Sequence, residues 1–216
     1  THLILRNAED KETAILLDDI DDQVDGSSLM PAGLTDRLTQ AELVDLTRFL
    51  SQLGKVGGLT VGRDRVVRRW QSLLDSDDAR FQLRRTRLGS VTEDNPAFVW
   101  QSSYSQVDGS LPLNEQPQLP FKGPFQKADS SLVFLRFEIE TGTAGAVDLV
   151  LNSTSGVTAW LDTVPLEPAD RIRLDLSEGT HRVTLAVSLA DRTEPIRAQL
   201  DDVAGSKAQI QLVSGK

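Results

Sequence analysis

Residues 132–139 read Leu-Val-Phe-Leu-Arg-Phe-Glu-Ile, and this stretch decides the fold class. Val133, Leu135, Phe137 and Ile139 occupy every second position and alternate with mostly polar neighbours. Successive side chains of a strand point to opposite faces of a sheet, so a period of two indicates a half-buried β-strand.

The same period recurs six more times towards the C-terminus. The apolar positions are Val147, Leu149 and Leu151; Val157, Ala159 and Leu161; Ile172, Leu174 and Leu176; Val183, Leu185, Val187 and Leu189; Ile196, Ala198 and Leu200; and Ile210 and Leu212. Turn sequences separate the seven runs, at roughly 10 to 15 residues from strand to strand. Because this leaves no room for crossover helices, we expect residues 96–216 to form an antiparallel β-sandwich of jelly-roll or galactose-binding-like type.

A helix is expected upstream of these strands. Thr39 and Glu42 form a capping box, in which each side chain satisfies a free backbone N–H group at the helix start, so the helix should begin at Gln40. Leu43, Leu46, Leu50 and Leu53 then recur at helical spacing, and Gly54 is suited to end the helix.

The preceding residues are too few to cover this helix. His2–Arg6 and Thr13–Leu17 read as two strands of a hairpin, which is too small to make a core with the apolar stripe of the helix. Residues 1–54 are therefore expected to be the back half of a larger domain. From residue 55 to residue 95 the periodicity fades and arginines gather, so we interpret this segment as a connector.

Composition excludes several classes of protein. The 216 residues contain 32 acidic and 23 basic side chains, and a net charge of −9 disfavours nucleic acid as a partner. No run approaches the ~18 apolar residues of a membrane span, and no signal peptide is recognisable, so a signal for export would lie outside this chain. Cys is absent, which excludes disulfides, thiolate metal sites and thioether attachment of haem within these residues.

No catalytic constellation stands out. His181 is the one sandwich histidine that a Ser-His-Asp triad could use, and its place after a turn favours a structural role. Five carboxylates lie near turns, but the sequence selects no pair of them for glycoside hydrolysis: Asp162, Asp175, Glu194, Asp201 and Asp202. The acidic run Asp18–Asp25 does not match the spacing of a calcium-binding EF-hand.

Aromatic residues define a second kind of candidate site. Trp100, Tyr104 and Trp160 could bind a carbohydrate if they are exposed. Trp160 lies on the opposite face of its strand from Val157 and Ala159, so alternation places it at solvent or at a domain interface.

One stretch resembles a known family. Ser28-Leu29-Met30-Pro31-Ala32-Gly33-Leu34, followed by Leu38-Thr39 and Glu42-Leu43-Val44-Asp45-Leu46, is similar to the C-terminal end of the cytochrome c-like haem domain of large planctomycete-type haem proteins. Longer members of that family resemble membrane-bound or sugar dehydrogenases. Shorter similarities include Val66 to Trp70, Ala159 to Asp162, Glu178 to His181, and the ending Gly205 to Gln209.

The resemblance implies a function for the parent protein. Met30 would be the distal ligand of haem iron, and the chain would be the C-terminal part of an exported, periplasmic electron-transfer protein with its haem and dehydrogenase-like domains upstream. The Cys-X-X-Cys-His attachment motif of the family is missing, so no haem is expected on this chain alone and no catalysis is expected in it. The alternative is a non-catalytic β-sandwich that binds a carbohydrate or cell-surface polymer, or that packs against a neighbouring domain.

Overall fold

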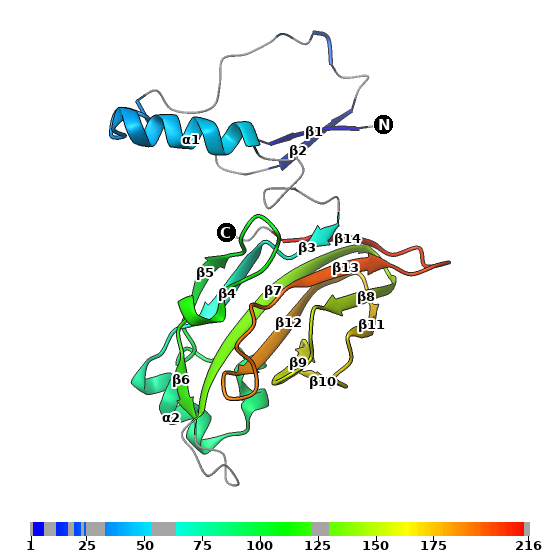
Figure 1. Ribbon diagram of the computed structural model, residues 1–216. Coiled ribbons are helices and arrows are strands. Elements are labelled where there is room, and N and C mark those ends of the chain that lie inside the picture. The colour runs from blue at the N-terminus through cyan, green and yellow to red at the C-terminus, as the bar shows by residue number, and fades with distance from the viewer. Residues whose placement is uncertain are drawn as a thin grey trace. The chain divides into compact units, whose positions relative to one another are not determined.

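The computed structural model describes residues 2–6, 12–16, 20–22, 24, 33–52, 64–121 and 130–213. The chain divides into two compact units, Thr1–Gln52 and Leu53–Lys216. Each unit is described by itself below, and both are drawn in Figure 1.

The first unit contains a hairpin and a helix, as the sequence predicts. Strands β1 (His2–Arg6) and β2 (Glu12–Leu16) pair antiparallel, and helix α1 spans Gln40–Gln52. The predicted capping box is confirmed, because the Thr39 amide donates to Glu42 Oε2 at 2.7 Å and the Glu42 amide donates to Thr39 Oγ1 at 3.3 Å. The expected end of the helix at Gly54 lies outside the described residues.

The second unit is mainly β and its sheets are antiparallel. The larger sheet has the order β10-β9-β12-β7-β4-β5, with β14 and β6 also paired to β7, and the smaller sheet has the order β11-β8-β13-β3. The bounds in the larger sheet are β4 Arg69–Leu73, β5 Trp100–Tyr104, β6 Leu119–Phe121, β7 Ser130–Thr143, β9 Val157–Leu161, β10 Val164–Leu166, β12 Gly179–Ser188 and β14 Gln209–Leu212. In the smaller sheet they are β3 Arg65–Val66, β8 Gly145–Leu151, β11 Arg171–Leu176 and β13 Ala198–Asp202.

The inner faces of the two sheets share one buried core. The alternating positions of β7 that decide the fold class, from Val133 to Ile139, are at most 3% exposed and pack with Leu149 of β8 and Leu174 of β11. All seven predicted runs contribute strands, although Ile196 itself forms an isolated bridge to Leu111 ahead of β13. The prediction of a mainly β, antiparallel, sandwich-like fold is therefore confirmed.

A second core lies on the other face of the larger sheet. Helix α2 (Asp77–Arg85) and the 3-10 helix η2 (Leu88–Thr92) lie there, and the short 3-10 helix η3 (Leu113–Glu115) follows β5. Ala79 and Leu83 of α2 and Val91 of η2 bury Phe134 and Trp160 of the sheet. Helix α2 is capped by Ser76, whose hydroxyl accepts from the Ala79 amide at 3.2 Å.

The structure corrects the expectation that residues 55–95 form a connector. Residues 64–95 belong to the second unit, where β3 and β4 extend its two sheets and the segment from α2 to η2 covers the larger one. Trp70 and Leu73 have no exposed surface, and Val67 is 1% exposed. These apolar residues are interleaved with arginines that lie at the sheet surface, so they lack the regular alternation by which the other strands were recognised.

Candidate functional site

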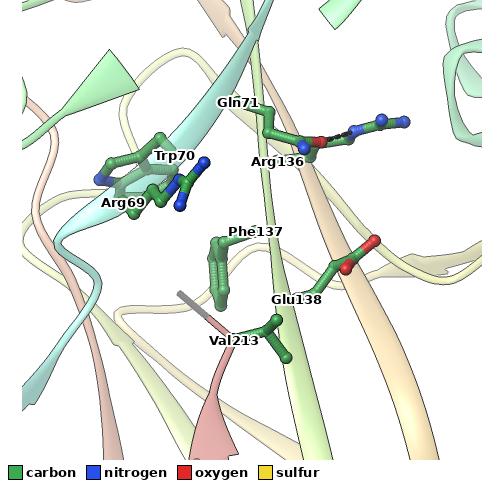
Figure 2. Close-up of a pocket in the computed structure, with 7 residues that line it drawn as sticks. All are labelled: Arg69, Trp70, Gln71, Arg136, Phe137, Glu138 and Val213. Atoms are coloured by element: carbon green, nitrogen blue, oxygen red, sulfur yellow. Dashed lines mark hydrogen bonds between the residues drawn. The ribbon is translucent and has the colours of Figure 1, made fainter. Parts of the chain in front are cut away.

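Polar side chains occupy one half of the outer face of the larger sheet, the face that lies away from the shared core. Along β7 this face passes from Leu132 and Phe134, which are buried under α2 and η2, to Arg136 and Glu138, which are half-buried. Figure 2 shows Arg136 and Glu138 extending to one side of β7 while Phe137 points to the other. The change of character along one strand marks the edge of the covering segment and leaves the polar half accessible.

The register of three strands brings six of these side chains together. Residues 69, 71 and 73 of β4 lie opposite residues 104, 102 and 100 of β5, and Gln71 lies opposite Arg136 of β7. The resulting set shares the outer face and is called the outer-face strip; it consists of Arg69, Gln71, Trp100, Ser102, Tyr104 and Arg136.

Arg136 is the most constrained member of the strip. Its Nε donates to Gln71 Oε1 at 2.6 Å, and its guanidinium carbon lies 4.1 Å from the centroid of the Trp100 ring. Neither terminal nitrogen has a hydrogen-bond or ion-pair partner among the residues that the structure describes. Burial, helped by the nearby Arg182, lowers the pKa of Arg136 to about 10, so the group still carries its charge at neutral pH.

A hollow of ≈ 290 Å³ opens beside this arginine. It is lined by residues 93–96 together with Phe98, Trp100 and Arg136. Arg182 holds its acidic wall in place, because it pairs with Asp94 at 3.1 Å and with Glu138 at 3.2 Å. The charge of Arg182 is thus compensated by two carboxylates within the fold, whereas no carboxylate contacts Arg136 in the described part of the chain.

The other end of the strip is more open. The guanidinium of Arg69 lies 5.8 Å from the centroid of the Tyr104 ring, and one of its terminal nitrogens donates to Ser102 Oγ at 3.2 Å. Tyr104 is 65% exposed. Both arginines of the strip are therefore placed over aromatic rings, an arrangement that restricts the orientation of a guanidinium.

Ser177, His181 and Asp162 lie in contact with one another. His181 Nδ1 contacts Asp162 Oδ2 at 2.9 Å, and Nε2 lies 3.0 Å from the carbonyl oxygen of Ser177 and 3.3 Å from its hydroxyl. A carboxylate and a carbonyl can only accept hydrogen bonds, so these contacts favour a ring in which the nitrogens donate. The ring thereby links Asp162, which follows β9, to Ser177, which precedes β12.

This arrangement makes the stability of the sandwich depend on pH. Burial disfavours the charged ring, but the hydrogen bonds to Asp162 and Ser177 outweigh burial and raise the pKa of His181 above 6.5. When folding raises the pKa of a group, the stabilisation is fully present at pH values below the pKa of the unfolded chain. It is lost as the pH rises through the pKa of the folded protein. We expect the free energy of unfolding to fall over that range in urea titrations.

The matching variant is His181→Gln, which should remove this part of the pH dependence. The change Glu178→Gln, at an exposed position in the same turn, should leave it intact. An identical pH profile for the wild type and the His181 variant would contradict the assignment.

The candidate acids do not form a hydrolytic pair. Asp162 contacts His181, Asp201 pairs with Arg171 at 2.8 Å, and Asp202 pairs with Arg65. Asp175 and Glu194 are exposed. Three of these carboxylates are thus engaged with basic side chains and not with one another.

The three aromatic candidates differ in how exposed their rings are. Trp100 is half-buried and Tyr104 is exposed, and both lie on the outer-face strip. The expectation that Trp160 offers a ligand surface is wrong, because this ring is 5% exposed and lies in the second core under α2 and η2. Alternation correctly placed Trp160 away from the shared core, but the covering segment is distant in sequence. Met30, the expected haem ligand, lies outside the described residues.

The sequence analysis did not predict Arg136 and Gln71 as site residues. The available signal was the break in β7, where the outward-facing positions change from Leu132 and Phe134 to Arg136 and Glu138. The sequence could not predict that Arg136 contacts Gln71, because 65 residues separate the two.

Comparison with protein families, with curated proteins and with solved structures found no match for the chain. Within the described ranges, no helix is long and apolar enough to cross a membrane. The same residues contain no group of three or more His, Asp or Glu side chains placed to hold a metal ion. The acidic run Asp18–Asp25 lies largely outside the described residues.

Proposed function

We propose that this chain works as the C-terminal part of a larger, exported haem c protein that transfers electrons, and that it performs no catalysis itself. The observation that carries the proposal is the apolar stripe on α1. Leu43 is 39% exposed, Leu46 is 40% exposed and Leu50 is 55% exposed, and no residue of α1 is buried.

A helix with such an apolar stripe needs another protein surface to cover it. Isolated helices shorter than ~12–15 residues are marginal in water, and most of their stability in proteins comes from packing of the apolar face. Helix α1 has 13 residues. The rest of a cytochrome c-like domain, supplied by sequence upstream, would cover the stripe.

The identity of that partner domain rests on the resemblance of residues 28–50. A thioether is a known axial ligand of haem iron and raises its reduction potential, and Met30 is the residue proposed for this role. Because the chain contains no Cys, the proposal places covalent attachment of haem in upstream sequence. A periplasmic location and upstream dehydrogenase-like domains are part of the same proposal.

The test is the visible spectrum and reduction potential of the longer native protein with Met30→Ala. Loss of the axial thioether should abolish the low-spin spectrum or lower the potential, while the neighbouring change Leu29→Ala should leave both unchanged. A parent protein without a haem band, or one whose spectrum and potential ignore Met30, would refute the electron-transfer proposal.

A second function is proposed for the sandwich-like unit, as a non-catalytic binding module for a carbohydrate or cell-surface polymer. It is favoured by the outer-face strip, which combines aromatic rings, a hydroxyl and an amide with Arg136 beside a hollow, and no carboxylate among the described residues contacts Arg136. Pockets that bind small ligands commonly pair apolar walls with a few fixed polar groups. We also propose that the sandwich is of jelly-roll or galactose-binding-like type. Retention of the chain on a panel of polysaccharides tests the binding function.

A further inference from the structure

We propose that two adjoining hollows on the outer face of the larger sheet bind consecutive units of an uncharged polysaccharide. This rests on the proposed binding function of the sandwich, and it names the class of the ligand and its minimum length of two units. It is carried by the position of the hollows next to each other and by the mixture of donors and acceptors that lines them.

The two hollows are of similar size. The first hollow is the one beside Arg136, with a volume of ≈ 290 Å³, and the second has a volume of ≈ 280 Å³. The second is lined by Glu138 and Arg182, by Asp162 and His181, and by three threonines. Each volume is near the lower limit of about 300 Å³ for pockets that hold a small ligand, which suits one sugar unit per hollow.

The hollows share one wall. Residues 92 and 93, which are consecutive in the chain, line the second and the first hollow respectively. Arg136 and Glu138 are alternate residues of β7, so they lie about 7 Å apart on the same face. Arg182 joins the two sides, because it pairs with Asp94 of the first hollow and with Glu138 of the second. A ligand that fills both hollows must therefore pass over this ion pair.

The first hollow offers both donors and acceptors. Arg136 presents two terminal nitrogens that have no partner among the described residues, and its guanidinium is already oriented. Glu93 is exposed, and its carboxylate likewise has no partner in the described part of the chain. The side-chain oxygen of Asn95 accepts from the backbone amide two residues on, which leaves its NH₂ group free to donate. Phe98 and Trp100 add apolar surface.

The second hollow offers hydroxyl groups in place of free charges. Glu138 and Arg182 compensate each other, and Asp162 contacts His181 at 2.9 Å. Thr163 and Thr180 are exposed, and no hydrogen bond of their hydroxyls is formed with the described residues. These hydroxyls can each donate one hydrogen bond and accept others.

This lining favours an uncharged sugar over a charged polymer. A sugar hydroxyl can donate to the carboxylate of Glu93 and also accept from the guanidinium of Arg136. An acidic polymer would be repelled by Glu93, and a basic polymer would be repelled by Arg136. Uncharged sugar units satisfy groups of both signs without burying a charge of their own.

The experiment is calorimetric titration of the full chain with soluble glucomannan, β-glucan and galactan, each in its native form and with its primary hydroxyls oxidised to carboxylates. We expect at least one native polymer to bind, with an affinity that changes little with salt. Its oxidised form should bind at least about tenfold more weakly, because carboxylates on the ligand face Glu93. Among oligosaccharides of that polymer, the monosaccharide should bind at least about tenfold more weakly than the trisaccharide, since only the longer ligand reaches both hollows.

One variant tests each hollow. Glu93→Ala removes a charged acceptor from the first hollow and should weaken binding at least about tenfold. Thr180→Val removes a hydroxyl from the second hollow and should weaken binding by about two- to tenfold. Glu194→Ala and Thr193→Val remove the same groups at exposed positions that line neither hollow, and both should leave the affinity unchanged. Circular dichroism should show that all four variants remain folded.

The possible failures have different meanings. Tighter binding of an oxidised polymer than of its native form would overturn this inference and leave the carbohydrate-binding function standing. The same holds if a native polymer binds with an affinity that neither Glu93→Ala nor Thr180→Val changes, because its site would then lie elsewhere. No binding of any polymer, native or oxidised, would overturn both the inference and the proposed binding function.

Discussion

Replacing Trp70 with alanine should lower the free energy of unfolding of the sandwich-like unit by about 3–5 kcal/mol. Trp70 has no exposed surface and stands edge-on to Phe137, with ring centroids 5.2 Å apart. Its Nε1 donates to Ser105 Oγ at 2.9 Å and lies 3.2 Å from the carbonyl oxygen of Val67. The change would therefore open a cavity in the shared core and remove the link between β4 and the segment after β5.

Urea unfolding followed by circular dichroism measures this loss. Trp70→Phe keeps an aromatic ring against Phe137 but removes the N–H donor, so its loss should be intermediate. Tyr104→Ala deletes an aromatic side chain that is 65% exposed, and it should change the free energy of unfolding by less than ~0.5 kcal/mol. A loss below ~1 kcal/mol for Trp70→Ala would mean that β4 is not part of the core.

Replacing Arg192 with methionine should cost about 2–4 kcal/mol of unfolding free energy, because it leaves several acceptors unpaired. Arg192 is 4% exposed, and its guanidinium donates to the carbonyl oxygens of residues 153, 194 and 195 and to Asn152 Oδ1, at 2.6 to 3.1 Å. Burial lowers the pKa of Arg192, and Glu194 partly opposes this effect. The side chain joins the loop after β8 to the loop after β12.

The measurement is again urea unfolding, with Arg84→Met as the matched control at an exposed position. The control should change the free energy of unfolding by less than ~0.5 kcal/mol. Methionine has a similar length and no donors, so the comparison isolates the hydrogen bonds from the packing. A stability equal to that of the wild type would show that water replaces the guanidinium at these carbonyls.

The two variants concern residues that sequence reasoning treated in different ways. Trp70 was assigned to a connector, and Arg192 was given no role. Neither could be placed in a core from local pattern, because each has partners that are distant in sequence. Trp70 contacts Phe137 of β7, and Arg192 contacts Ser153, 39 residues before it.

The sequence by itself determined what depends on neighbouring residues. Alternation from Val133 to Ile139 and in the six later runs predicted strands and the face of each that is buried, and short turns between them predicted antiparallel pairing. The Thr39–Glu42 capping box predicted the first residue of α1. These features arise from strand geometry, turn length and helix-end hydrogen bonds, which act over a few residues.

The tertiary structure alone decided what covers each outward face. Alternation placed Trp160 and Arg136 away from the shared core, but only the packing of α2 and η2 buries Trp160 and leaves Arg136 at an open hollow. The outer-face strip also needs β4 and β5 to pair beside β7, which joins Gln71 to Arg136. Such pairings between distant segments follow from the sum of many weak contacts across the whole unit, and no short stretch of sequence contains them.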